Sequence, residues 1–337
     1  MTRRHRVFFV VAVVLMLLLI PAGLTSGSVS LSLRQIIDAF GADGTLEHFI
    51  VVETRLPAIL TAALAGAGLS LAGLLMQTCF DNPLAGPSIM GISSGASLGV
   101  ALVMLAGVGF AGVWGTMAVI AGALAGAAVI LAILLLFSGT VRSSEVLLIV
   151  GVLIGYLVSS IISLLNFFAP DHAVHGFVVW GMGNFSSVTL AQMPIFGGLC
   201  LALCLVSAFY VKSLNALLFG ADYARTLGVS VNAARSSMLA IAGGLTAVIT
   251  AWCGPIAFLG LAMPHIARML LRTSNHRLLL PGVFLVGAIA GMLCQILSVL
   301  PSPWYAGILP VNAITPIVGV PVILYVLINR RKLLYFN

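Results

Sequence analysis

RLPAILTAALAGAGLSLAGLLMQTCFDNPLAGPSIMGISSGASLG, from Arg55 to Gly99, is the stretch that decides the fold. Two apolar runs rich in Leu, Ala and Gly flank the turn sequence DNPLAGP at residues 81–87. Pro83 and Pro87 restrict the residues before them to extended geometry, so a helix must stop and restart here. A membrane-crossing helix needs about 20 apolar residues at 1.5 Å each. The stretch therefore predicts two transmembrane helices joined by a short turn.

The rest of the chain has the same character. Of its 337 residues, 61% are hydrophobic and 7% are charged, whereas a soluble domain has about 25% charged residues. Ten apolar segments can be marked, at residues 7–24, 56–78, 88–107, 113–137, 146–168, 191–211, 233–252, 255–271, 278–299 and 309–329. The first could also be a cleaved signal peptide, but no small-x-small cleavage site follows it, so a retained span is favoured. We predict an all-α integral membrane protein with about ten transmembrane helices in a single domain, residues 1–337.

The positive charges indicate how these segments are oriented. If residues 255–271 span the membrane and the N-terminus is cytoplasmic, thirteen of the fifteen Lys and Arg residues are cytoplasmic, and only Arg34 and Arg55 are external. If residues 255–271 do not span, the split becomes seven and eight. Because cytoplasmic loops carry an excess of Lys and Arg, we predict ten spans with both termini cytoplasmic. The net charge of +7 therefore reflects orientation, and nucleic acid is not a predicted partner.

No charged residue lies deep in any apolar segment, which argues against coupling to protons or sodium ions. The polar residues that remain there are neutral, and each either bonds a neighbouring helix or lines a polar path: Gln77, Asn166, Gln192, Gln295 and Asn312. The five cysteines form no CxxC pair and are expected to be packing residues, so no metal site is predicted. Neither lysine, Lys212 or Lys332, follows a glycine, so the sequence has no P-loop for ATP hydrolysis.

Small residues recur four positions apart in the apolar segments. They are Gly91, Gly95 and Gly99, then Gly122 with Gly126, Gly151 with Gly155, and Gly287 with Gly291. Helices in lipid associate through close backbone approach, which small residues permit. We therefore expect these glycines to lie at helix–helix contacts in a tight bundle.

Two further stretches are more patterned than ordinary loops. LLFGADYARTLGVSVNAAR, residues 217–235, reads as a short amphipathic cytoplasmic helix that ends at Gly228. Its Leu217, Leu218, Phe219 and Leu227 would be exposed and would need a partner to cover them. GPIAFLGLAMPHIAR, residues 254–268, forms the short eighth segment and leads into a basic turn.

Together these stretches resemble the FecCD family, the permeases of type II ABC importers for iron-siderophores, haem and vitamin B12. Four motifs appear in order: the Arg55–Ala96 stretch with RLP, Gln77 and NPLA; DYARTLG at 222–228; GPIAFLGLAMPHIAR at 254–268; and LPVNAITPIVGVPV at 309–322. The likeness covers about four fifths of the chain.

The resemblance implies a permease that works as a homodimer or with a homologous partner. Alternating access at the dimer interface would move a bulky metal chelate, such as a ferric siderophore, haem or a corrinoid, across the bacterial inner membrane. A cytoplasmic ABC ATPase dimer would use ATP and Mg, a periplasmic or lipid-anchored binding protein would deliver the cargo, and this chain would bind no cofactor. By position, the ATPase coupling residues would be Gly220, Asp222, Ala224, Leu227 and Gly228. Asn82, Leu84, Ser143 and Ser144 would form the cytoplasmic gate, and Arg55 would dock the binding protein.

The chain departs from the family pattern where the binding protein would dock. Ala58 stands in place of the second arginine of RLPR, and Gln295 with Val299 replaces an Asp-x-x-x-Arg pair. Ile308 replaces the Glu that opens the last span, and Asn312 replaces its Gly. Either the binding protein docks differently, or a second, non-identical permease supplies those contacts.

Two other classes of protein are less compatible with the sequence. A secondary transporter would be expected to carry intramembrane charges. A membrane enzyme acting on polyprenyl phosphates would need clustered acids for magnesium, and the closest acid pairs here, such as Asp38 with Asp43, lie in an external loop. A smaller oxyanion such as molybdate remains an alternative cargo within the same family.

Overall fold

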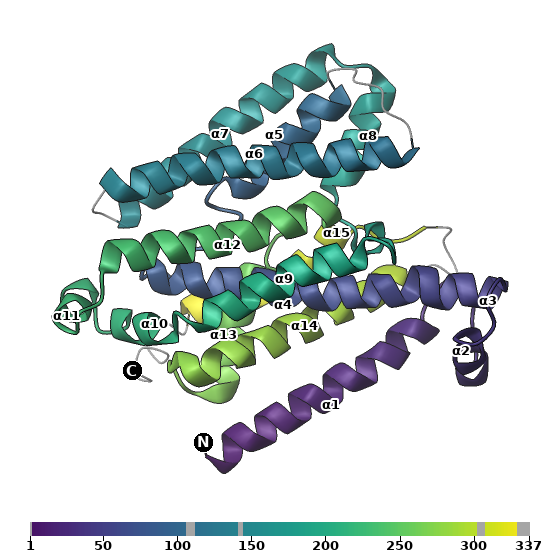
Figure 1. The fold of residues 1–337 in the computed structure, drawn as a ribbon, viewed down its shortest axis with the longest axis horizontal. Coiled ribbons are helices and arrows are strands. Elements are labelled where there is room, and N and C mark those ends of the chain that lie inside the picture. The colour runs from purple at the N-terminus through teal and green to yellow at the C-terminus, as the bar shows by residue number, and fades with distance from the viewer. Residues whose placement is uncertain (1, 106–111, 141–143, 302–306, 329–337) are drawn as a thin grey trace. The chain divides into compact units, whose positions relative to one another are not determined.

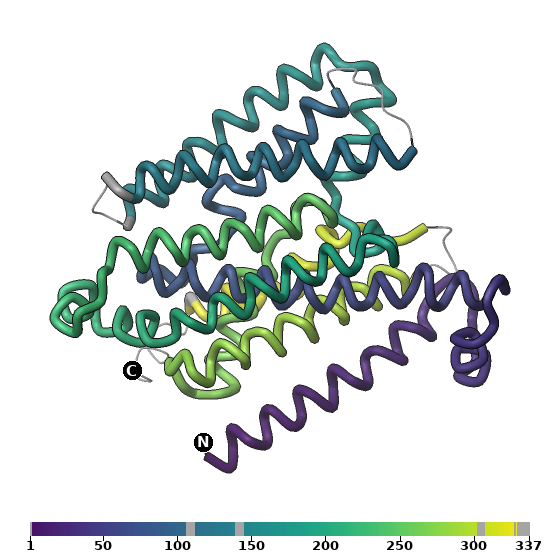
Figure 2. The backbone as a smooth tube through the Cα atoms, in the orientation of Figure 1, coloured from purple at the N-terminus to yellow at the C-terminus, as the bar shows by residue number. Residues whose placement is uncertain are grey.

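The computed structural model of the protein describes residues 2–105, 112–140, 144–301 and 307–328, and within these ranges it contains helices and loops but no strand (Figures 1 and 2). The helices are α1 Arg3–Thr25, α2 Leu33–Ala39, α3 Leu46–His48, the π-helix η1 Phe49–Arg55, α4 Leu56–Cys79, α5 Ile92–Leu105, α6 Gly112–Thr140, α7 Ser144–Phe168, α8 Asp171–Gly181, the 3₁₀ turn η2 Phe185–Ser187, α9 Met193–Ala208, α10 Val211–Leu217, α11 Ala221–Thr226, α12 Val231–Cys253, α13 Leu259–Leu271, α14 His276–Val299 and α15 Val311–Ile328.

Each of the ten predicted apolar segments corresponds to one of these helices, which confirms the all-α prediction. Among the described residues, six helical stretches are long and apolar enough to cross a membrane unaided, and a seventh is counted if α9 and α10, bent by 55°, are one span. α5 and α13 have only 14 and 13 residues. The predicted total of ten spans is therefore approximate.

The break before α13 explains why this helix is short. The predicted segment began at residue 255, but the helix begins at Leu259. Gly254 and Phe258 both have positive φ, 74° and 68°, so the chain between them cannot continue the helix. The Asn312 side chain holds this segment, because its Oδ1 accepts a hydrogen bond from the Ala257 N–H at 3.1 Å.

The chain forms two compact units, and each is discontinuous in sequence. One comprises Met1–Ser70, Asn184–Leu201 and Ala257–Asn337, and the other Leu71–Gly183 and Ala202–Ile256. These units are groups of residues in mutual contact, and they do not test whether residues 1–337 form a single transmembrane domain. That stays a prediction.

In the first unit, α14 packs closely against α4. A Cβ atom added to Gly287 would lie 2.5 Å from the Gly66 carbonyl oxygen, and one added to Gly291 would overlap the Ala62 carbonyl oxygen. Such approach is possible only without side chains, so the predicted Gly287–Gly291 pair is confirmed as a helix contact. α1 packs along α14, where Leu19 joins a small buried cluster.

In the second unit, the same principle joins α5 to α6. A Cβ atom on Gly99 would overlap the carbonyl oxygen of Gly122, and one on Gly95 would lie 2.6 Å from that of Gly126. The predicted glycine faces of these two helices are therefore in contact with each other. α12 covers α6, and α7 and α8 pack on α5.

Candidate functional site

The predicted coupling loop contains the short helix α11 between two glycines with positive φ, 96° at Gly220 and 81° at Gly228. The Gly228 N–H donates to the Arg225 carbonyl, and the Val229 N–H donates to the Ala224 carbonyl, each at 3.0 Å. This pair of bonds is a Schellman motif, which satisfies the last carbonyls of a helix through a left-handed residue. The predicted left-handed helix stop at Gly228 is confirmed.

The exposed face of this loop is apolar. Phe219 is 73% exposed and Leu227 58% exposed, and the Phe219 ring lies 5.4 Å from the ring of Tyr223. Ala224 is fully buried and anchors the opposite face. The Asp222–Arg225 ion pair, 2.7 Å long, is exposed, so it contributes little to stability.

One detail of the predicted loop is wrong. Leu217 was expected on the exposed face, but it is the last residue of α10 and is buried with Leu214. The predicted single amphipathic helix is two helices, α10 and α11, because the chain breaks at Leu218–Gly220. α10 turns Leu217 inward, and the exposed apolar face begins within the break, at Leu218 and Phe219.

The predicted gate turn follows α4 and has a local geometry that the prolines alone do not explain. Asp81 adopts a left-handed conformation with φ 46°, and the Asn82 N–H donates to the Gln77 carbonyl at 3.1 Å. The Asn82 Oδ1 then accepts a hydrogen bond from the Leu84 N–H at 2.9 Å. This Asx turn leaves the Leu84 side chain exposed. The helix stop that Pro83 predicted is confirmed.

The gate prediction also included two serines of the next cytoplasmic turn. Ser143 lies outside the described residues, and Ser144 is the first residue of α7.

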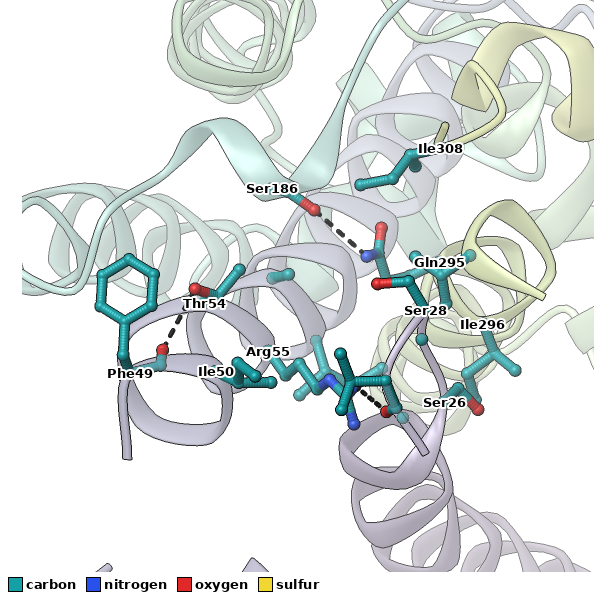
Figure 3. Close-up of a pocket in the computed structure, with 16 residues that line it drawn as sticks. Ser26, Ser28, Phe49, Ile50, Thr54, Arg55, Ser186, Gln295, Ile296 and Ile308 are labelled. Carbon is teal, nitrogen blue, oxygen red and sulfur yellow. Dashed lines mark hydrogen bonds between the residues drawn. The ribbon is translucent and has the colours of Figure 1, made fainter. Parts of the chain in front are cut away.

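Arg55, at the end of η1, lines a cavity of about 270 Å³ in the first unit (Figure 3). Its guanidinium group donates to the Leu24 carbonyl, in the last turn of α1, at 2.6 Å and to the Val29 carbonyl, in the segment that follows α1, at 2.5 Å. Gly27 lies against the guanidinium, where a Cβ atom would be 2.7 Å from one of its nitrogens. The side chain is half-buried, so it closes the loop after α1 and still presents part of its charge to the cavity.

The same cavity is lined by four residues that depart from the family pattern, namely Ala58, Gln295, Val299 and Ile308. The Gln295 Nε2 donates to the Ser186 Oγ at 3.3 Å, and Figure 3 shows these side chains pointing toward each other. The sequence did not predict that these positions meet, nor that Ser186 joins them. Asn312, the fifth departure, acts elsewhere by holding Ala257.

Within the described part of the chain, no group of three or more His, Cys, Asp or Glu side chains is arranged to hold a metal ion. All five cysteines are buried free thiols, in keeping with packing residues.

Comparisons with known proteins agree on one family. The profile of the FecCD transport family matches residues 14–329. The vitamin B12 import system permease protein BtuC of Citrobacter koseri is 35% identical over 298 residues, covering 88% of this chain and 87% of that protein. BtuC of Shigella boydii is 35% identical over 326 residues, covering 95% and 94%. A solved structure described as an inward-facing conformation of a transporter assigned to the metal-chelate ABC type superposes with a TM-score of 0.82 at 27% identity, covering 96% of this chain and 99% of that one.

Proposed function

We propose a cargo and a mechanism for this chain from the premise that it belongs to the FecCD transport family. It is the membrane permease of an ABC importer, with the type II permease fold. Its cargo is a bulky metal chelate, and a corrinoid is the first to test, because relatives that cover most of the chain import vitamin B12. Ferric siderophores and haem are the other candidates. The chain resides in the bacterial inner membrane with both termini in the cytoplasm.

The observation that carries this proposal is the geometry of α11. A six-residue helix is too short to be stable alone in water, yet α11 is held between two glycines with positive φ. Tyr223 on this helix is exposed, together with Phe219 before it and Leu227 at its C-cap. Exposed apolar side chains on a rigid short helix fit a protein groove. We assign that groove to the ATPase dimer, with Gly220, Asp222, Ala224, Leu227 and Gly228 as the coupling residues. The chain itself binds no cofactor, and ATP and Mg act in the partner.

A second permease copy fits the exposed face of α7. Only 17% of the residues in an apolar 18-residue stretch of this helix are buried. Tyr156, Ser159 and Ser160 are exposed on it, which adds hydroxyl groups to a largely apolar helix. We propose that two such helices border the translocation path and that ATP binding shifts the dimer between states open to opposite sides.

Asn82 and Leu84 would close this path on the cytoplasmic side, together with Ser143 and Ser144. The Asx turn at Asn82 supports this role, because it fixes the direction of the exposed Leu84 side chain.

The proposal is tested by reconstituting the chain in liposomes with its ATPase and binding protein. Uptake of cyanocobalamin is expected to require ATP and to continue when ionophores abolish proton and sodium gradients. Ferric hydroxamate and haem serve as competing cargoes. Uptake that follows an ion gradient without ATP would contradict the mechanism, and uptake of another chelate in preference to cobalamin would change only the cargo.

Arg55 is the proposed contact for the binding protein. Two of its five N–H groups are used by the Leu24 and Val29 carbonyls, which leaves donors for an acidic partner. Arg55→Glu should weaken binding-protein affinity and flatten its salt dependence, because it replaces attraction with repulsion. The basal ATPase rate should not change.

Arg55→Lys separates docking from loop closure. Lysine keeps the charge but cannot reproduce the two-pronged contact with both carbonyls. If docking depends on charge, Arg55→Lys keeps most of the salt dependence that Arg55→Glu loses. Wild-type affinity in Arg55→Glu would show that Arg55 only closes the loop after α1.

A further inference from the structure

An apolar groove of about 490 Å³ lies between α1, α13, α14 and α15 in the first unit, and of its lining residues only Ile296 also lines the cavity at Arg55. α1 packs on both α13 and α14 (Figure 1), but its N-terminal half leaves this space beside them. The groove extends along α1 from Phe8 to Leu15, about 10 Å at the rise of an α-helix.

The groove has a closed floor and an open side. Ala12, Met263 and Cys294 are buried at its base, whereas lining residues such as Val11 and Leu293 are exposed. Every lining side chain is apolar. A long, apolar and laterally open channel fits a flexible hydrocarbon chain better than a compact polar ligand.

One end of the groove is strongly basic. The Arg4 guanidinium donates to the Leu270 carbonyl at 2.8 Å, and the His5 Nε2 lies 3.2 Å from the Leu271 carbonyl oxygen. These contacts bring the N-terminus of α1 to the C-terminus of α13, next to Arg272. Arg4 and Arg272 are exposed, as are the neighbouring Arg3, Arg6 and Arg277.

Within the first unit, no acid lies near this charge. In the sequence of the first unit, all four acids lie between Asp38 and Glu53. That segment is joined to the opposite end of α1, where Arg55 bonds the Leu24 carbonyl. α1 has 23 residues and is about 34 Å long, so the acids are well beyond a Debye length of about 10 Å. The basic end of the groove is therefore complementary to an anionic group.

We propose that this groove binds an anionic phospholipid from the leaflet on the side of the N-terminus. One acyl chain lies along α1 between α13 and α14, and Arg4 and Arg272 hold the phosphate. The groove opens on an exposed side of the first unit, and its lipid is independent of the cargo.

Native mass spectrometry of the full-length chain tests the proposal. The purified protein is offered equal amounts of phosphatidylglycerol and phosphatidylcholine with identical acyl chains. We expect phosphatidylglycerol to be preferred by about tenfold, because each basic residue near an anionic lipid contributes appreciably to binding. The double change Arg4→Gln with Arg272→Gln should remove the preference and leave phosphatidylcholine binding unchanged. Inorganic phosphate should not compete, since it lacks the acyl chain.

Filling the groove tests the acyl-chain site separately. Ala290→Phe should reduce retention of both lipids, whereas Ala202→Phe, on an exposed part of α9 outside the groove, should not. Leu293→Trp fills the same groove from a partly exposed wall and serves if Ala290→Phe does not fold. Arg34→Gln is the charge control. Equal binding of the two lipids by the wild type, or unchanged phosphatidylglycerol retention in the groove-filling variants, would overturn the proposal.

Discussion

Gly228→Val should abolish ATP-driven uptake while the membrane helices still insert. Gly228 has φ 81° and ends α11 in a Schellman motif. A side chain in this left-handed conformation costs about 1–3 kcal/mol, and a β-branched one is the least suited to it. No atom lies within 4 Å of a Cβ added here, so the substitution acts through the backbone alone. The Schellman turn that ends α11 would be disrupted, and the Leu227 side chain would no longer be held in its present orientation.

The loss should appear as failure of the ATPase to co-purify and as uptake reduced more than tenfold, since about 1.4 kcal/mol corresponds to a factor of ten. Gly228→Asn is the matched control, because asparagine tolerates the left-handed region and the site has room for its side chain. Asn should therefore retain most of the activity. If Val and Asn both transport at the wild-type rate, the basic turn from Arg268 to Arg277 becomes the next candidate for coupling.

Leu227→Asp tests the same proposed contact with the ATPase by replacing an apolar side chain with a charged one. Leu227 is exposed beside the Schellman turn, and burial of such a side chain in a partner groove contributes about 1.5–3 kcal/mol. A carboxylate there should release the ATPase without disturbing α11, because it leaves Gly228 and its hydrogen bonds intact.

Features set by local chain chemistry were predicted from the sequence. The ten apolar segments became helices because a bilayer leaves the backbone no other partners than its own. The stop at Gly228 followed from a glycine placed after an amphipathic stretch. The glycines of α5 and α6 lie at helix contacts as expected, since only glycine permits that approach, but the sequence did not show that these two sets face each other.

The direction of single side chains was harder to predict. Leu217 and Leu218 are adjacent leucines of equal hydrophobicity, yet only Leu217 is buried. The break that separates α10 from α11 decides this, and the sequence there, LLFG, carries no proline to mark it. Asp81 is a similar case, because its left-handed conformation is stabilised by hydrogen bonds that a composition pattern does not reveal.

Contacts across long sequence separations account for what was missed at the cavity lined by Arg55. Arg55 bonds carbonyls 31 and 26 residues away, and Gln295 bonds Ser186 across 109 residues. Backbone carbonyls leave no trace in the sequence, so Arg55 looked like a free external charge. The substitutions at Ala58, Gln295, Val299 and Ile308 looked independent until they were found to line one cavity.

Gly291→Val should prevent α14 from docking on α4 and so disrupt this cavity as well as the first unit. A Cβ atom at Gly291 would overlap the Ala62 carbonyl oxygen and lie 3.2 Å from the Gly66 Cα. These are backbone atoms that cannot rotate away, so the helices would have to separate, at a cost of about 3 kcal/mol or more. Gln295 is one helical turn beyond Gly291 and would move with it, breaking its bond to Ser186.

Gly198→Val is the matched control, because Gly198 lies in α9 with nothing within 4 Å of an added Cβ. Both variants lose a helical glycine and gain the same side chain, so only the helix contact differs. Thermal denaturation in detergent, followed by the fraction of monodisperse protein, should show a large loss for Gly291→Val and little change for Gly198→Val. Gly291→Ala should fall between them, since it adds the clashing Cβ but no further bulk. Equal melting of the two valine variants would mean that the packing of α14 on α4 does not depend on close backbone contact, and the cavity lined by Arg55 would then need another origin.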